Sequence, residues 1–76
     1  MPHVIVKLAV GRSEQTKTRI AEAITQIIVT NALCDESAVS VSIEDVESKD
    51  WVEKVYKPDI VGGAAQLYKK PGYNPL

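Results

Sequence analysis

Three segments with different spacing of apolar residues follow one another in the first 44 residues of the chain. Residues 3–10 (HVIVKLAV) are β-branched and apolar with few breaks, which is typical of a strand buried on both faces. In residues 14 to about 33 apolar side chains recur at helical spacing, and in residues 39–44 they alternate with polar ones, as in a half-buried strand. This order predicts a β-α-β unit of the α/β (α+β) class with parallel strands.

The predicted helix follows Gly11-Arg12-Ser13, where Ser13 is a good N-cap and Glu14 suits the first turn. Its recurring apolar residues are Ile20, Ala23, Ile24, Ile27 and Ile28. The residues expected on the opposite, solvent side are Lys17, Thr18, Glu22, Thr25 and Gln26. The helix is therefore predicted to be amphipathic.

The second half of the chain has weaker signals. Residues 45–50 are acidic and predict a loop, and residues 51–56 are long enough for one or two helical turns. Pro58 is expected to stop that piece, because proline removes a backbone donor. Residues 59–70 predict a second helix, which the Gly62-Gly63 pair weakens by about 1 kcal/mol per glycine.

The length of 76 residues predicts one domain, residues 1–76. A domain this small is expected to need help with its stability beyond its own core. Disulfide bonding does not supply that help, because Cys34 is the only cysteine. A two-stranded parallel sheet with one helix is also incomplete, since parallel sheets need cover on both faces. We therefore expect two chains to join edge to edge into a four-stranded sheet, as part of a homo-oligomer.

Charge and composition exclude several kinds of partner. The net charge is -1 and no basic stripe is present, so nucleic acid is a poor candidate. No apolar run is long enough to span a bilayer, and no signal peptide precedes the first strand, so no membrane association is expected. The unpaired Cys34 indicates a reducing compartment, and we expect a cytoplasmic protein. The carboxylates of residues 44–50 lack metal-ligand spacing and predict a solvated charge run, with no metal site.

Pro2 is the residue with the clearest chemical potential. Processing enzymes usually remove a methionine that precedes a small residue, and removal of Met1 would leave Pro2 with a free secondary amine. An α-amino group titrates at about 7.7–8.0, and burial or a nearby cation lowers that pKa toward the range of a general base. Pro2 is therefore a candidate general base. A proline that merely begins a strand is the alternative that this residue alone leaves open.

Several motifs together resemble the 4-oxalocrotonate tautomerase family. These are the Met-Pro start, the hydrophobic strand, Gly-Arg-Ser before an amphipathic helix, the later SAVSVSI strand and Trp51. The Pro-His start, the Lys-Lys-Pro-Gly-Tyr tail and a tryptophan in place of phenylalanine look most like the longer-tailed PptA branch. The resemblance implies a β-α-β tautomerase fold that pairs with a second subunit, with a dimer favoured over the hexamer of the classical members.

The resemblance also implies roles for individual residues. Pro2 falls on the family's catalytic proline, Arg12 on a carboxylate-binding arginine, and Trp51 on an aromatic pocket residue. Ser40 stands where the classical enzyme has a second arginine, which favours a monocarboxylate substrate and leaves Ser40 as a hydrogen-bond donor to it. Arg12 is also compatible with a neighbouring subunit's site. His3 is expected to face solvent or to pack, because adjacent strand residues point to opposite faces.

The function that the resemblance implies is enol–keto tautomerisation of a small enolpyruvate or 2-hydroxydienoate, without a cofactor. Two alternatives stay open. The same amine serves hydration, dehalogenation or decarboxylation in other members of the superfamily, although no additional water-activating group stands out in this chain. The loss of the second arginine is also compatible with an oligomeric module whose site is idle.

Overall fold

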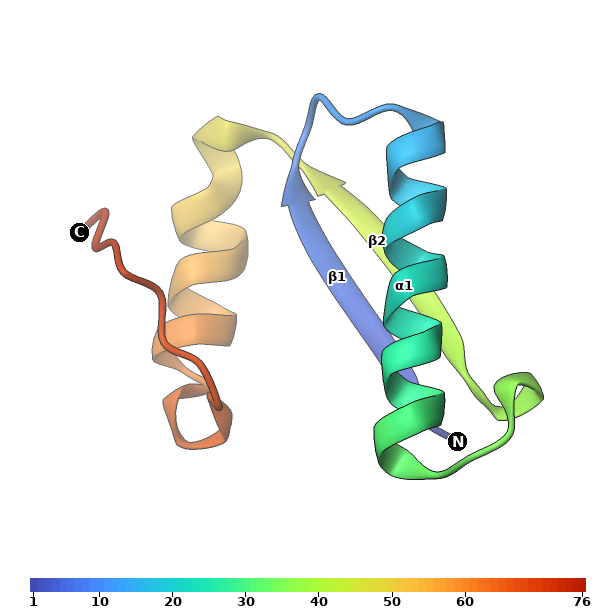
Figure 1. Ribbon diagram of the computed structural model, residues 1–76. Coiled ribbons are helices and arrows are strands. Elements are labelled where there is room, and N and C mark those ends of the chain that lie inside the picture. The colour runs from blue at the N-terminus through green and yellow to red at the C-terminus, as the bar shows by residue number, and fades with distance from the viewer.

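The computed structural model describes all 76 residues. Its elements in chain order are β1 (His3–Ala9), α1 (Glu14–Ala32), η1 (Glu36–Ala38), β2 (Ser40–Val46), η2 (Ser48–Asp50), η3 (Val52–Val61) and η4 (Ala64–Gln66). The two strands are parallel, with His3 opposite Ser40 and Ala9 opposite Val46. Helix α1 lies against one face of this sheet (Figure 1). The predicted β-α-β unit is confirmed.

Helix α1 begins where the sequence predicts. The hydroxyl of Ser13 accepts a hydrogen bond from the Thr16 backbone N–H at 3.1 Å, which satisfies one of the free donors of the first turn. Gly11 precedes this cap with a φ of 125°, a conformation that favours glycine, and it turns the chain out of β1. The helix ends at Ala32, and Leu33 then adopts a left-handed conformation.

The sheet-facing side of α1 differs from the predicted one. Lys17 and Thr25 were expected on the solvent side, yet both are half-buried. The aliphatic stem of Lys17 covers apolar surface, while its ammonium group reaches Asp45 of β2 at 2.9 Å. Ile27, expected among the apolar face, is 60% exposed. The helix is therefore rotated so that its apolar stripe extends beyond the surface that the sheet covers.

The helix after β2 also differs from the prediction. We expected Pro58 to end a short helical piece, but η3 runs through it to Val61 as a π-helix. Its last bond joins the Gly62 N–H to the carbonyl of Lys57 at 2.9 Å, five residues apart. This wider turn accommodates the proline ring, which would collide with the carbonyl four residues earlier in an α-helix.

The second predicted helix, residues 59–70, is absent, and the structure there reduces to the single turn of η4. The reason lies in the Gly62-Gly63 pair that ends η3. A Cβ atom at Gly62 would lie 2.5 Å from the carbonyl oxygen of Pro58, and one at Gly63 would meet the carbonyl of Asp59. The glycines are therefore required by a close approach of backbone, and they mark a helix end rather than a helix interior.

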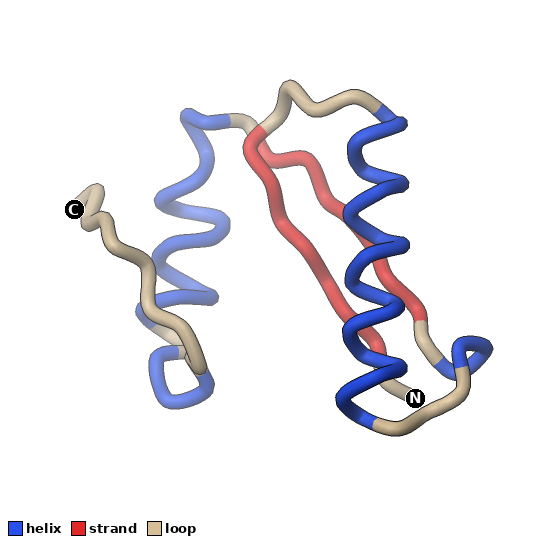
Figure 2. The backbone as a smooth tube through the Cα atoms, in the orientation of Figure 1, coloured by secondary structure: helices blue, strands red, loops and turns tan.

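Helix η3 lies beside β1 on the face of the sheet that α1 leaves open (Figure 2). The Lys7 ammonium group donates to the Asp59 carboxylate at 2.5 Å and ties the two elements together. Beside this ion pair, Ile5 and Val55 line a cleft of about 380 Å³. None of the helices is both long and apolar enough to cross a membrane.

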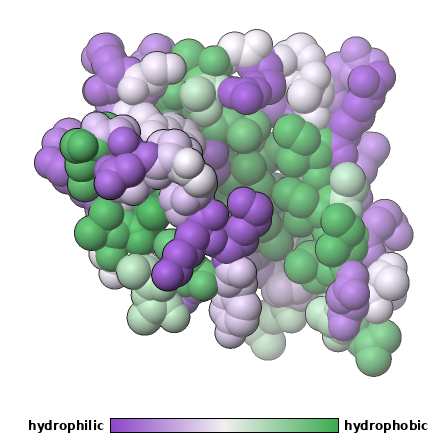
Figure 3. Space-filling model, turned by 60° about the vertical axis from the view of Figure 1, so that its left-hand side comes forward, coloured by the Kyte–Doolittle hydropathy of each residue, from purple (hydrophilic) through white to green (hydrophobic).

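The isolated chain has very little core. Only Val55 and Tyr56 are buried, and both belong to η3. The accessible surface is 5738 Å², whereas a compact chain of 8.3 kDa exposes about 4,600 Å². The radius of gyration is 13.9 Å, against about 11 Å for a compact domain of this length. Strand β1 is accordingly not buried on both faces in the single chain, since Ile5 is 55% exposed, and Figure 3 shows a broad hydrophobic area open to solvent.

Candidate active site

Pro2 lies at the start of β1 and is half-buried. Its carbonyl accepts a hydrogen bond from the Ser40 N–H at 3.2 Å, so the β1–β2 ladder fixes its backbone. The preceding residue, Met1, is completely exposed. While Met1 is attached, the Pro2 nitrogen is an amide and cannot act as a base. Its removal would place a secondary amine at a fixed point on the sheet edge.

Ser40 and His3 meet beside Pro2. They are direct neighbours in the parallel register, and His3 Nδ1 lies 2.6 Å from the Ser40 hydroxyl oxygen. Both residues are exposed, as expected for His3. The structure thus brings the backbones of Pro2 and Ser40 together, and His3 is the side chain that orients the serine hydroxyl. Sequence reasoning missed this pairing, because the strand register that creates it is not visible in the residues alone.

Arg12 lies at the other end of β1, in the loop before α1. Strand β1 has seven residues, which separates the Pro2 and Arg12 ends by about 23 Å. Arg12 is exposed, and its guanidinium group donates to the Ala9 carbonyl at 2.8 Å. It forms no ion pair, so its charge is available to a carboxylate. One chain therefore does not bring the predicted base and the predicted anion anchor together.

Trp51 directly follows η2, close after the end of β2. In Figure 1 the segment that follows β2 lies at the same end of the molecule as the loop between β1 and α1. Its indole N–H donates a hydrogen bond to the Tyr73 hydroxyl at 2.9 Å. The Tyr73 ring in turn packs against Tyr56 with a centroid separation of 5.6 Å and a tilt of 50°. Sequence reasoning missed Tyr56 and Tyr73. The available signal was composition, because three of the four aromatic residues of the chain meet here.

The ammonium groups of two lysines near the strands form ion pairs with carboxylates. The hydrogen bond to Asp59 raises the pKa of Lys7. Hydrogen bonds to Asp45 and then Glu14 raise the pKa of Lys17. Each lysine stays charged and is held by its partners, so neither is free to bind a substrate carboxylate.

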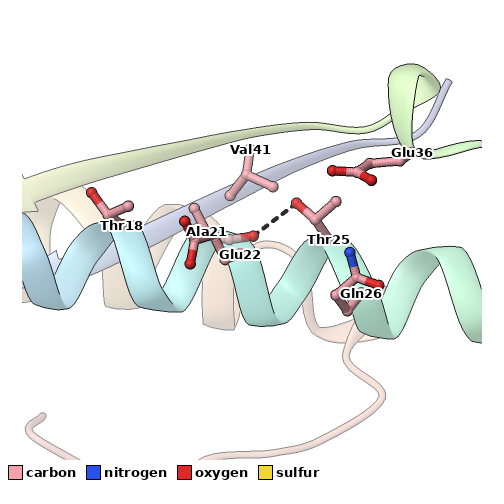
Figure 4. Close-up of a pocket in the computed structure, with 7 residues that line it drawn as sticks. All are labelled: Thr18, Ala21, Glu22, Thr25, Gln26, Glu36 and Val41. Atoms are coloured by element: carbon pink, nitrogen blue, oxygen red, sulfur yellow. Dashed lines mark hydrogen bonds between the residues drawn. The ribbon is translucent and has the colours of Figure 1, made fainter.

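The largest cavity, about 660 Å³, lies elsewhere, in the groove between α1 and β2 (Figure 4). Its lining residues are Thr18, Ala21, Glu22, Thr25, Gln26, Glu36 and Val41. None of the four predicted site residues contributes to it. The carboxylates of Glu22 and Glu36 would repel an enol acid, and the Thr25 hydroxyl is engaged with the Ala21 carbonyl at 2.8 Å. No group of three or more potential metal ligands is clustered anywhere in the structure.

Comparison with known proteins identifies the family. A family model described as tautomerase enzyme matches residues 2–55, which include β1, α1, β2 and Trp51. The chain is 45% identical over 76 residues to a probable tautomerase of Xylella fastidiosa (strain 9a5c), covering 100% of the chain and 93% of that protein. It is 39% identical over 75 residues to tautomerase PptA of Klebsiella pneumoniae (strain 342), covering 97% and 99%. With tautomerase PptA of Enterobacter sp. (strain 638) the identity is 33% over the same shares. The chain therefore belongs to the tautomerase family, in its PptA-like branch, and is an isomerase.

Proposed function

We propose that this enzyme converts a small enolpyruvate or 2-hydroxydienoate monocarboxylate to its keto form, with Pro2 as general base and then general acid. The observation that carries the proposal is the setting of Pro2, which is half-buried, fixed by Ser40 and preceded by a fully exposed Met1. Met1 is accessible to a processing enzyme, and the amine it uncovers belongs to a class that titrates at about 7.7–8.0. A useful fraction of the amine is therefore unprotonated near neutral pH.

The proposed reaction needs only one mobile proton. The Pro2 nitrogen takes the proton from the enol oxygen and leaves an enolate, in which the electron pair of the broken O–H bond begins to form the carbonyl and shifts the carbon–carbon π pair toward the carbon atom that is to be protonated. The protonated amine then delivers the proton to that carbon atom, where the former carbon–carbon π pair forms the new C–H bond, and the N–H electron pair returns to nitrogen and restores the free base. General acid–base help of this kind contributes roughly 10²–10⁴-fold to the rate.

The charges near the site favour a substrate with one carboxylate. Arg12 supplies a guanidinium without a carboxylate partner, and such a group can bind a carboxylate with two parallel hydrogen bonds. Ser40, in the place of the classical enzyme's second arginine, offers a neutral hydroxyl oriented by His3. That hydroxyl suits a hydrogen bond to the enol oxygen better than an ion pair with a second carboxylate. Trp51 supplies a flat apolar wall for the rest of the substrate.

We propose that two chains build each site. Because a two-fold axis makes paired edge strands antiparallel, the Pro2 end of one strand lies beside the Arg12 end of its partner. The pairing thus bridges the length of β1, about 23 Å, which lies between the two residues in one chain. The chain exposes about 1,100 Å² more than a compact monomer of its mass, and a standard interface buries about 800 Å² per partner. A homodimer therefore accounts for the surplus, and we favour it over a hexamer.

We also propose that residues 1–76 act as one domain in the cytoplasm. The strands and helices contact one another along the whole chain, as in the ion pair between β1 and η3. Cys34 is a free thiol, which is stable in a reducing compartment.

The test is the substitution Pro2→Ala, assayed by the ketonisation of phenylenolpyruvate. Mass spectrometry first establishes that Met1 is absent from both wild type and variant. We expect kcat/KM to fall about 100-fold or more, because the secondary amine is lost while the helix and strands are untouched. Circular dichroism and sedimentation serve as controls for folding and assembly. An unchanged rate in a processed, folded variant would remove the general-base assignment.

A further inference from the structure

The C-terminal tail returns to the candidate site through Tyr73. After η4 the chain has no further helix or strand, and it folds back along η3 (Figures 1 and 2). Tyr73 packs on Tyr56, one of the two buried residues of the chain, and accepts the Trp51 indole hydrogen bond at 2.9 Å. Tyr68, in the same tail, is completely exposed. The contact at Tyr73 is therefore specific to that position.

The hydrogen bond to Tyr73 constrains the orientation of Trp51. An indole has a single donor, and here that donor is directed at one acceptor from the tail. The acceptor is itself held in place, because the Tyr73 ring packs on a residue that is 7% exposed. A chain of three aromatic side chains thus links the buried part of η3 to the indole. About half of the Tyr73 residue, 49%, stays exposed and is open to a ligand or a partner chain.

We propose that Tyr73 is a positioning residue: it holds the Trp51 indole in the orientation that packs against a substrate ring, and so makes the tail a determinant of preference for aryl over alkyl enol acids. The inference depends on the proposed function, in which Trp51 forms the apolar wall. Aromatic pairs prefer offset or edge-to-face arrangements, so the gain from a substrate ring depends on the angle of the indole. An alkyl substituent has no such angular requirement.

The first test compares Tyr73→Phe with Tyr68→Phe. The first substitution removes the hydroxyl that accepts the indole bond and retains the ring on Tyr56, whereas the second makes the same chemical change at an exposed position. A hydrogen bond of ordinary strength corresponds to a change of about 3- to 10-fold. We expect Tyr73→Phe to lower kcat/KM for phenylenolpyruvate by about that factor, mainly through KM, and to change the value for an alkyl enolpyruvate by less than about 2-fold. Tyr68→Phe should change neither.

The second test is independent of catalysis. Trp51 is the only tryptophan, so its fluorescence reports directly on the binding of 3-phenylpropionate, an aryl monocarboxylate without an enol. We expect Tyr73→Phe to weaken this binding by about 3- to 10-fold. In activity assays, Tyr73→Phe should have no further effect in a Trp51→Phe background, because the donor is already absent.

These readings separate the two proposals. If Pro2→Ala retains full activity while Tyr73→Phe still weakens 3-phenylpropionate binding, the general-base proposal fails and the positioning role stands. Equal losses for aryl and alkyl substrates, unchanged aryl binding, or additive effects of the two aromatic substitutions would each overturn the positioning role. Equal losses would instead show that Tyr73 only supports the fold.

Discussion

Mixing two variants that each lack one proposed site residue tests whether the site is shared between chains. The variants are Pro2→Ala, which removes the proposed base, and Arg12→Ala, which removes the proposed anion anchor. In one chain the two positions lie beyond opposite ends of β1, a strand about 23 Å long, which is more than one small substrate can span. Each site in an assembly would then take its proline from one chain and its arginine from another.

The expected recovery follows from counting sites. In an equal mixture with random exchange, a site receives an intact proline with a probability of one half and an intact arginine with the same probability, so about 25% of sites are intact. The result is the same for a dimer and for a larger ring. If instead both residues came from the same chain, every site would lack one of them, and the mixture would show only the mean of its parents.

The assay is ketonisation of phenylenolpyruvate by the two variants, alone and after joint refolding from denaturant. Sedimentation of each sample controls for assembly. A mixture of wild type with the doubly substituted chain gives the reference activity with which the first mixture is compared. In that second mixture the same counting predicts about 25% intact sites if the site is shared and about 50% if it is not. Activity of the first mixture at the mean of its parents, with proven exchange of subunits, would refute the shared site.

Two further predictions concern the scaffold. Ser13→Ala removes the cap on the Thr16 N–H and should lower the free energy of unfolding by about 1 kcal/mol. For a chain of 76 residues this lowers the midpoint temperature of unfolding by about 6 °C at fixed protein concentration, whereas Ser13→Asp should retain the wild-type midpoint. Equal midpoints for all three proteins would contradict the cap. The Lys7–Asp59 pair raises the pKa of Lys7 above its ordinary value of 10.5, so its contribution is fully present below that pH and is lost as the pH rises through the raised pKa. Urea unfolding between pH 9 and 12 should therefore show a steeper alkaline loss in wild type than in Asp59→Asn, and parallel curves would exclude this linkage.

The first half of the fold was predictable because local patterns specify it. Helical spacing and a serine cap place α1, and alternation places β2, whatever the rest of the chain does. The rotation of α1 was not predictable, because the long stem of Lys17 lets a charged residue lie on the covered face. The prediction of two helices in the second half of the chain was wrong for a related reason. Pro58 and the glycine pair were treated as local breaks, but a π-helix absorbs the proline and the glycines serve a close backbone contact.

The residues of the candidate site could be proposed from sequence, but their arrangement could not. Pro2 and Ser40 are neighbours only through the strand register, and His3 joins them for the same reason. The Trp51–Tyr73 bond spans 22 positions and depends on the path of a tail without regular structure. Such contacts leave no periodicity in the sequence. They follow from tertiary packing, which single-residue patterns do not encode.

The stability of the fold and the proposed chemistry both favour pairing with a second chain. With two buried residues, a single copy has little core, and the partner chain that we propose would cover the surplus surface. In an isologous pairing of edge strands, the two copies of the strand run antiparallel. The N-terminal end of one strand then lies beside the C-terminal end of the other. The proline and the arginine lie at opposite ends of one strand, so the pairing that completes the core would also complete the site. A chain of 76 residues would thereby obtain a desolvated, two-sided pocket that it is too small to enclose alone.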